Sequence, residues 1–136
     1  LKKIKASEVI ASKLGLGKGE PVVYLYRRRF ADNEPIVLQK TYLSCKKCGF
    51  ILDCDFTKDS LYKSLARTNQ TKVVRVQRIV EVDEATNEDA ENLEIAMGKP
   101  IQSFTTTGFN VFGEVIEFSL ARYRGDRSRF EVSANI

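Results

Sequence analysis

Histidine and tryptophan are absent from this sequence of 136 residues, and only three cysteines, three prolines and one methionine occur in it. Without histidine, the chain has no Ser-His-Asp or Cys-His catalytic arrangement and no histidine-ligated metal site. An odd number of cysteines fits a reducing compartment better than a framework of disulfides. We therefore expect a protein with no bound metal and no cofactor.

Long hydrophobic runs are also missing. No apolar run approaches the ~20 residues that a membrane-spanning helix requires. Residues 1–10 lack the apolar region and the cleavage pattern of a secretory signal peptide, and the chain does not begin with methionine. We therefore expect a cytoplasmic domain without membrane contact that is part of a longer protein.

The composition is typical of one globular domain, with 43% hydrophobic and 29% charged residues. The net charge of +4 hides an asymmetry, because residues 1–72 contain 15 basic and 7 acidic side chains, whereas residues 73–136 contain 7 basic and 11 acidic ones. A uniformly basic nucleic-acid binder would not show this division. The division suits an anionic ligand in the basic half, or an attraction between the two halves within a domain or a dimer.

Turn residues and hydrophobic periodicity divide the chain into strands and short helices. We expect helices at residues 8–14, 59–66 and 87–96, the first capped by Ser7 and the third by Thr86 with Asp89. We expect strands at residues 22–30, 36–43, 72–82, 101–109, 114–123 and 128–133, and an irregular segment at residues 44–58. This order predicts an α+β fold with a mainly antiparallel sheet of about six strands and flanking helices.

Three consecutive arginines end the first of these strands. Since side chains alternate along a strand, Arg27 and Arg29 share one face ~7 Å apart, whereas Arg28 lies on the other. Two guanidinium groups on one face suit a phosphate or a carboxylate. The alternative, which the run by itself favours, is a solvated strand end whose arginine stems cover apolar surface.

Two other polar residues allow both a structural and a functional interpretation. Ser60 lies near the start of the second helix, where serine is most often a cap, but its hydroxyl and the free N–H groups beside it also suit an anion. Glu117 shares a strand face with Val115, Ser119 and Ala121, which is unusual for a carboxylate. Glu117 either pairs with an arginine within the sheet or accepts hydrogen bonds from ligand hydroxyls.

The spacing of Cys45 and Cys48, with Cys54 six residues further on, raises the question of a zinc site. A structural zinc site needs four ligands, and without histidine only a carboxylate such as Asp53 or Asp55 would complete the set. We therefore expect three reduced thiols in a loop rather than a metal site.

An ordered set of short motifs resembles a known family. The motifs are Leu14-Gly15-Leu16, Gly19-Glu20-Pro21, the arginine-rich residues 26–30 with the turn at residues 31–35, Tyr42-Leu43, Ser60-Leu61-Tyr62, Gly98-Lys99-Pro100, residues 113–119 and Tyr123-Arg124-Gly125-Asp126-Arg127. In this order they resemble the UTRA domain, the effector-binding half of HutC-type transcriptional regulators in the GntR superfamily. The resemblance extends from about residue 6 to residue 131, and the strand that ends in residues 123–127 contributes most to it.

The resemblance implies a chorismate-lyase-like fold, no catalysis, and a homodimer in the bacterial cytoplasm. It also implies a small effector, often a phosphorylated sugar or an organic acid, and operator DNA bound by a winged helix-turn-helix domain upstream of Leu1. The effector-binding residues that it implies are Arg27, Arg29, Ser60, Tyr62, Glu117, Tyr123 and Arg124. In this scheme the Arg27 and Arg29 side chains and Ser60 hold the anionic group.

Two other functions remain compatible with the residues. A chorismate-lyase-like enzyme needs a closed pocket with cations and a carboxylate, which Arg27, Arg29 and Glu117 would supply. A direct nucleic-acid binder would use the basic half, but no recognisable nucleic-acid-reading motif occurs in it. The regulator-type ending at residues 123–127 favours an effector-binding domain over both.

Overall fold

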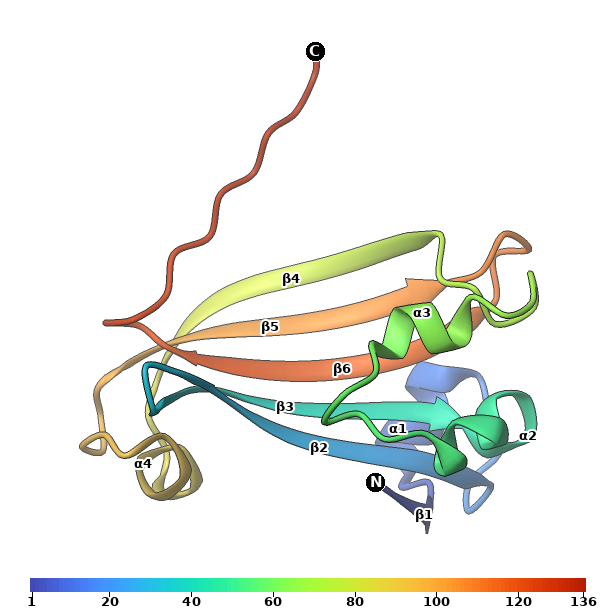
Figure 1. Cartoon of the computed structure of the whole chain (residues 1–136), viewed down its shortest axis with the longest axis horizontal. Helices are drawn as coiled ribbons and strands as arrows, with labels where there is room; N and C mark the ends of the chain where they lie inside the picture. Colours follow the sequence, from blue (N-terminus) through green and yellow to red (C-terminus); the bar gives the residue numbers. More distant parts are fainter.

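Six antiparallel strands form one sheet in the computed structural model, which describes all 136 residues (Figure 1). The strands are β1 (Lys2–Lys5), β2 (Pro21–Ala31), β3 (Glu34–Ser44), β4 (Arg75–Glu84), β5 (Pro100–Phe109) and β6 (Val115–Arg124). Their order in space is β1-β2-β3-β6-β5-β4, so β1 and β4 are the two edges. The predicted α+β fold with an antiparallel sheet is therefore confirmed.

Short helices cover both faces of this sheet. They are α1 (Glu8–Leu14), α2 (Cys45–Cys48), the 3-10 helix η1 (Gly49–Asp53), α3 (Leu61–Leu65) and α4 (Asn87–Leu93). The α2, η1 and α3 segments pack on the face that carries Val23, Leu25 and Leu43, which we call the α3 face. The α1 and α4 helices pack on the opposite face, which we call the α1 face. None of the helices has the length and apolar character that a membrane crossing requires.

The hydrophobic core lies on both sides of the central strands. On the α3 face, Val23 and its neighbours pack against Ile51 and Leu65. On the α1 face, Val22 packs beneath α1, and Leu38 packs beneath α4. Because successive side chains of a strand point to opposite faces, the adjacent Val22 and Val23 are both fully buried. The middle of the sheet is therefore held between two helical layers.

The predicted caps of the first and last helices are present. Ser7 accepts a hydrogen bond from the Ile10 N–H, and Gly15 ends α1 with a φ of 69°. At the start of α4, Thr86 accepts a bond from the Asp89 N–H, while the Asp89 carboxylate accepts one from the Thr86 N–H. Asp89, although shorter than the glutamate or glutamine usual at this position, thus completes a reciprocal capping box.

Some boundaries differ from the prediction. Residues 44–58 contain α2 and η1 and are not wholly irregular, and α4 ends at Leu93, where Glu94 adopts the left-handed conformation. The edge strand β1 was not predicted, because four residues of which three are lysines have no apolar alternation.

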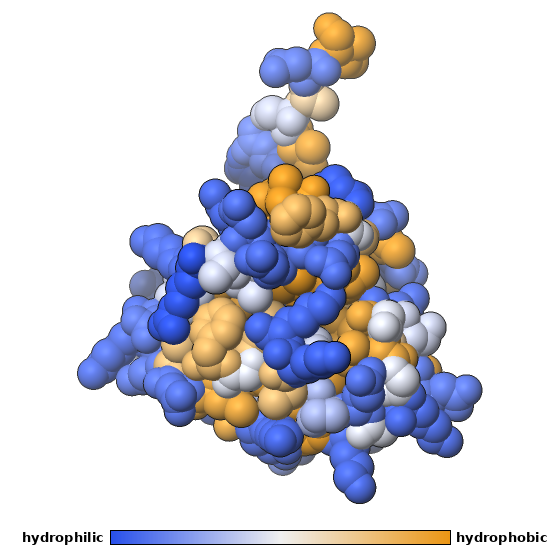
Figure 2. Space-filling model, turned by 90° about the vertical axis from the view of Figure 1, so that its right-hand side faces the viewer, coloured by the Kyte–Doolittle hydropathy of each residue, from blue (hydrophilic) through white to orange (hydrophobic).

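The C-terminal segment is not a strand, so the prediction for residues 128–133 is wrong. After Gly125 the chain leaves the sheet, and the Phe130 ring packs edge-on against Phe104 with 5.0 Å between ring centroids. The last residues project from the body of the molecule (Figures 1 and 2). Aromatic packing rather than strand pairing therefore fixes this segment to the sheet.

Candidate functional site

A cavity of about 330 Å³ opens on the α3 face, between the sheet and the start of α3. Its lining residues are Arg27, Arg29, Gln39, Ser60, Leu61, Tyr62, Arg78, Glu117 and Tyr123. Six of these nine are among the seven residues that the sequence suggested, and they come from β2, β6 and the start of α3.

The antiparallel register explains why the strand residues meet. Arg27 lies opposite Gln39 of β3, and Gln39 lies opposite Ala121 of β6. In the same way, Arg29 lies opposite Val37 of β3, and Val37 lies opposite Tyr123 of β6. Directly opposed residues share a face, so the pairing places both arginines and Tyr123 on the α3 face, as strand alternation predicted.

Arg27 and Arg29 lie in this cavity without an anionic partner. Neither takes part in any of the ion pairs of the structure, and Arg27 Nε is buried with no hydrogen-bond partner. Burial lowers the pKa of Arg27, and the charge of Arg29 lowers it further. Two neighbouring cations in this state would be stabilised by an anionic group between them.

Arg28 has a different environment on the α1 face. Its guanidinium stacks over the Phe30 ring, 5.0 Å from the ring centroid, and donates a hydrogen bond to the Asn92 carbonyl at 3.4 Å. Of the three consecutive arginines, Arg27 and Arg29 therefore line the cavity, whereas Arg28 connects β2 to α4 on the other face.

Glu117 is a buried carboxylate, only 2% exposed, at the inner end of the cavity. The Tyr62 hydroxyl donates to its Oε1, and the Ser119 hydroxyl donates to its Oε2 at 2.8 Å. Glu117 makes no ion pair with Arg27 or Arg29, so the salt bridge within the sheet that the sequence left open is absent. Hydrogen bonds from hydroxyl groups hold the carboxylate instead.

Gly108 makes room for this carboxylate. It lies directly opposite Glu117 in the pairing of β5 with β6. A Cβ on Gly108 would lie 2.8 Å from Glu117 Cγ, closer than side chains approach one another, and 3.1 Å from Val73 Cγ1, which is tighter than most side-chain contacts. The absence of a side chain at this position is therefore part of the site's construction.

Tyr62 connects α3 to the sheet through its bond to Glu117. Burial, together with the negative charge of Glu117, raises the pKa of the Tyr62 phenol well above its usual value, while the charge of Arg78 acts in the opposite direction. The phenol therefore stays protonated at neutral pH and acts as a hydrogen-bond donor.

Ser60 occupies the N-cap position of α3, but its side chain makes no capping hydrogen bond. The sequence-based interpretation of this serine as a cap is therefore wrong. Its hydroxyl instead lines the cavity with Arg27 and Arg29, where it is available to a ligand.

Arg124 is the one suggested residue that the structure does not bring into this cavity. It alternates with Tyr123 along β6 and so points to the α1 face. Its guanidinium donates to the Asp126 carboxylate at 2.9 and 3.1 Å and lies 3.9 Å from Glu34. These contacts stabilise the turn that follows β6.

Sequence reasoning missed three lining residues, the apolar Leu61 and the polar Gln39 and Arg78. Arg78 extends from the edge strand β4, and its Nε donates to Thr106 Oγ1 at 3.3 Å. The hairpin turn does not identify Gln39, because a register shift between Arg29 and Phe30 places Gln39 rather than Leu38 opposite Arg27. No local signal identifies Arg78, because β4 is far along the chain from β2, which carries Arg27 and Arg29.

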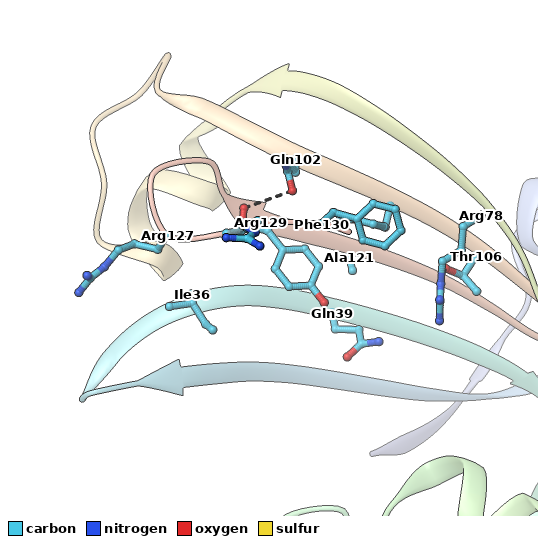
Figure 3. A pocket seen from close by; sticks show the side chains of 12 residues that line it. Ile36, Gln39, Arg78, Gln102, Thr106, Ala121, Arg127, Arg129 and Phe130 are labelled. Atoms are coloured by element: carbon cyan, nitrogen blue, oxygen red, sulfur yellow. Dashed lines mark hydrogen bonds between the residues drawn. The ribbon is translucent and has the colours of Figure 1, made fainter. Parts of the chain in front are cut away.

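A second cavity of about 410 Å³ adjoins the first and shares Gln39, Arg78 and Tyr123 with it (Figure 3). The C-terminal segment, residues 127–130, forms one of its walls. Ser128 is held there by a hydrogen bond to Gln102 at 3.3 Å, drawn as a dashed line in Figure 3. The α3 face therefore carries two adjoining hollows with Arg78 and Tyr123 between them.

All three cysteines are free, with Cys48 inside the core cluster of the α3 face and Cys45 and Cys54 packed against it. Burial raises the pKa of the Cys48 thiol to about 12. The structure contains no group of three or more cysteine or acidic side chains arranged to hold a metal ion, so its geometry does not support the zinc site considered from the spacing.

Comparison with known proteins decides the family. The family model for the UTRA domain matches residues 1–129. The chain belongs to the UTRA domain family. The resemblance seen in the sequence motifs is thereby confirmed, and the chain is an effector-binding domain of the kind found in GntR-family transcriptional regulators.

Individual relatives of this UTRA domain are transcriptional regulators. It is 30% identical over 121 residues to the HTH-type transcriptional regulator GmuR of Bacillus subtilis (strain 168), covering 89% of this chain and 51% of GmuR. It is 28% identical over 127 residues to the HTH-type transcriptional repressor NagR of the same organism, covering 93% of this chain and 52% of NagR. The chain thus spans about half the length of these curated relatives.

A solved structure agrees with this assignment. The transcriptional regulator (GntR family) from Enterococcus faecalis V583 superposes with a TM-score of 0.89 at 25% identity, covering 98% of this chain and 95% of that one. These relatives are regulators and not enzymes, so the comparisons do not favour the chorismate-lyase alternative.

Proposed function

We propose that this UTRA domain binds a small anionic metabolite, such as a phosphorylated sugar or an organic acid, in the cavity on the α3 face. The observation that carries the proposal is the pair Arg27 and Arg29, two cations without an anion, one of them with a buried Nε that has no partner. Their guanidinium groups and the free Ser60 hydroxyl would hold the anionic group by charge-assisted hydrogen bonds.

The far end of the ligand would meet groups that bind hydroxyls. Glu117 accepts bonds from Tyr62 and Ser119 and retains acceptor capacity on each oxygen. Tyr123 lines the same cavity six residues further along β6, across β3 from Arg29, so it would meet the ligand nearer its anionic end. A ligand with an anionic group at one end and hydroxyls at the other fits this division better than a purely apolar one.

Regulation would follow from linkage to a second domain. We infer that a winged helix-turn-helix domain upstream of Leu1 binds operator DNA, as the names of GmuR and NagR suggest for those proteins. The full-length protein would be a HutC-type homodimer in the bacterial cytoplasm. The effector would change DNA affinity only by the difference between its affinities for two arrangements of that dimer.

Thermal unfolding of the chain with a panel of ligands tests the proposal. The panel contains glucose 6-phosphate, glucosamine 6-phosphate, citrate and inorganic phosphate, with glucose and glucosamine as uncharged or cationic controls. At about 100 times its Kd, a ligand stabilises the fold by about 2.7 kcal/mol, which raises Tm by several degrees. We expect at least one anion to do so and its unphosphorylated counterpart to have no effect.

Variants connect the shift to the site. The double variant Arg27→Ala/Arg29→Ala should lose the shift. The matched variant Arg28→Ala should keep it, because Arg28 lies on the other face of the same strand. An equal shift in the double variant and the wild type, or no shift with any anion, would overturn the proposal.

A further inference from the structure

The second cavity of the α3 face, which we call the second hollow, has no role in the binding scheme above. Its volume is about 410 Å³, against about 330 Å³ for the cavity of Arg27 and Arg29, which we call the arginine hollow. Both values lie at the lower end of the roughly 300–1,000 Å³ that is typical of small-molecule sites. Gln39, Arg78 and Tyr123 line both hollows, so a ligand larger than one hollow would extend across these side chains into the other.

A row of directly opposed residues forms the floor from one hollow to the other. Arg27 of β2 lies opposite Gln39 of β3, and Gln39 lies opposite Ala121 of β6. Ala121 in turn lies opposite Phe104 of β5. Directly opposed residues share a face, so this row crosses the α3 face beneath both hollows. The small Ala121 side chain at the start of the second hollow leaves room above the floor between the arginines and Phe104.

The second hollow differs from the arginine hollow in charge. Arg127 donates to the Glu34 carboxylate at 2.9 Å, and Arg129 donates to Glu131 at 3.4 Å with 87% of its side chain exposed. Of the arginines that line the second hollow, only Arg78 lacks a carboxylate partner, and it lies at the boundary with the arginine hollow. The second hollow therefore suits an uncharged group rather than a second anion.

Three aromatic rings form the apolar part of the second hollow. Phe104 lies between Tyr123 and Phe130, with edge-on contacts at 5.1 and 5.0 Å between ring centroids. Rings in edge-on contact leave part of their faces uncovered, and Phe130 is 46% exposed. The negative face of an aromatic ring attracts weakly positive C–H groups, such as those on the flat side of a sugar ring.

Neutral hydrogen-bonding groups surround the same space (Figure 3). They are the amides of Gln39 and Gln102 and the hydroxyls of Thr106 and Ser128. Ser128 donates to Gln102 Oε1 at 3.3 Å, and the NH₂ group of Gln102 remains as a donor. Amides and hydroxyls both donate and accept, so they bind alcohol groups in either direction. Aromatic rings beside such groups suit an uncharged ring that carries hydroxyls.

We propose that the second hollow is a second subsite of the effector site and takes an uncharged, hydroxylated ring. The effector is then a two-ring molecule, a disaccharide phosphorylated on one ring, with its phosphate at Arg27 and Arg29 and its second ring against Phe104 and Phe130. The inference rests on the proposed function, because that function places the anionic group, and it narrows the class of ligand.

Isothermal titration calorimetry with one-ring and two-ring phosphates tests the second subsite. Glucose 6-phosphate fills the arginine hollow alone, whereas cellobiose 6′-phosphate and maltose 6′-phosphate add an uncharged glucose ring. We expect at least one of these disaccharide phosphates to bind about 10-fold more tightly than glucose 6-phosphate, or better. Phenyl 6-phospho-β-glucoside, whose second ring has no hydroxyls, should gain less.

Phe130→Ala should separate the two hollows, because Phe130 lines only the second. We expect it to raise the Kd of the tighter disaccharide phosphate about 10-fold and to leave that of glucose 6-phosphate within about 2-fold. Phe112→Ala is the matched control, since Phe112 is 64% exposed in the turn between β5 and β6 and lines neither hollow. It should leave both Kd values unchanged, with circular dichroism confirming that both variants are folded.

Gln102→Leu tests the recognition of hydroxyls, because it keeps the size of the side chain and removes its hydrogen bonds. It should weaken the disaccharide phosphate about 5-fold and leave glucose 6-phosphate unchanged. Gln77→Leu is its control, since Gln77 is an exposed residue of β4 that lines neither hollow.

Three results would overturn the second subsite. They are equal affinities for one-ring and two-ring phosphates, tightest binding by the phenyl glucoside, and an equal loss of both kinds of ligand in Phe130→Ala. Each of them leaves the proposed function standing, because glucose 6-phosphate still binds at Arg27 and Arg29. If no phosphorylated probe binds, the proposed function and the second subsite fail together.

Discussion

At the residue scale, the candidate site depends on how Glu117 is held. Its carboxylate has almost no contact with solvent and is positioned by Tyr62 from α3 and by Ser119 from its own strand. An unpartnered buried acceptor costs about 1–3 kcal/mol, so the two hydroxyl donors are needed for this residue to remain in place. The same geometry would present its remaining lone pairs to a ligand.

Gly108→Ala should displace this carboxylate. The added Cβ would meet Glu117 Cγ at 2.8 Å, so the bond to Tyr62 is lost or β5 must shift. We expect a loss of about 1–3 kcal/mol in the free energy of unfolding, measured by urea denaturation. Gly17→Ala is the control, because its Cβ would have ordinary contacts of 3.7 Å or more. Equal stability of the two variants would contradict the close packing of Gly108 on Glu117.

At the element scale, α4 is a seven-residue helix that depends on contacts at its start. A helix this short is not stable by itself, so tertiary contacts must hold it. Asp89 supplies one of them, because its carboxylate accepts bonds from Arg122 of β6 at 3.0 Å, and the same carboxylate completes the local capping box with Thr86. One side chain thereby fixes both the beginning of α4 and its position on the sheet.

The Asp89→Asn variant should show a pH-dependent loss of stability. Burial acts to raise the pKa of Asp89, but hydrogen bonds from Arg122 and Thr86 outweigh it and hold this pKa below its usual value. A carboxyl with a lowered folded-state pKa stabilises the fold above its unfolded pKa of about 3.9, and the contribution disappears as the pH falls through the folded pKa.

We therefore expect Asp89→Asn to be about 2–3 kcal/mol less stable than the wild type near pH 7, and the difference to shrink below about pH 4. Urea denaturation at a series of pH values measures it. Asp126→Asn is the control, because Asp126 pairs with Arg124 at the exposed surface and should cost less than about 1 kcal/mol. A difference that does not change between neutral and acid pH would contradict the role given to the Asp89 charge.

At the scale of the whole molecule, the charge asymmetry of the sequence acts within the domain. β3, from the basic half, pairs with β6, from the acidic half, in the middle of the sheet. Ion pairs join the halves, with Lys40 bound to Glu88 at 2.7 Å and Lys47 to Glu114 at 3.4 Å. Arg27 and Arg29 of the cavity take part in none of these ion pairs, so their positive charge is available to a ligand.

The sequence by itself determined the local parts of this structure. The caps Ser7 and Thr86 and the alternation along β2 follow from neighbouring residues and are present, and the turn predicted at residues 31–35 is present as the shorter Asp32-Asn33. Alternation also placed Arg27 and Arg29 on one face, so most of the cavity's residues were identifiable once the family motifs were seen. These signals are reliable because they depend on backbone sterics and on hydrogen bonds within a few residues.

Only the tertiary structure decided which of these local parts meet. It brought Arg78 into the cavity, left Arg124 outside it, freed the Ser60 hydroxyl from capping and kept residues 128–133 out of the sheet. Each outcome depends on the pairing order of strands that are distant along the chain. That order is set by burial of the middle of the sheet between its helices, because local preferences fix the face of a side chain but not the strand beside it.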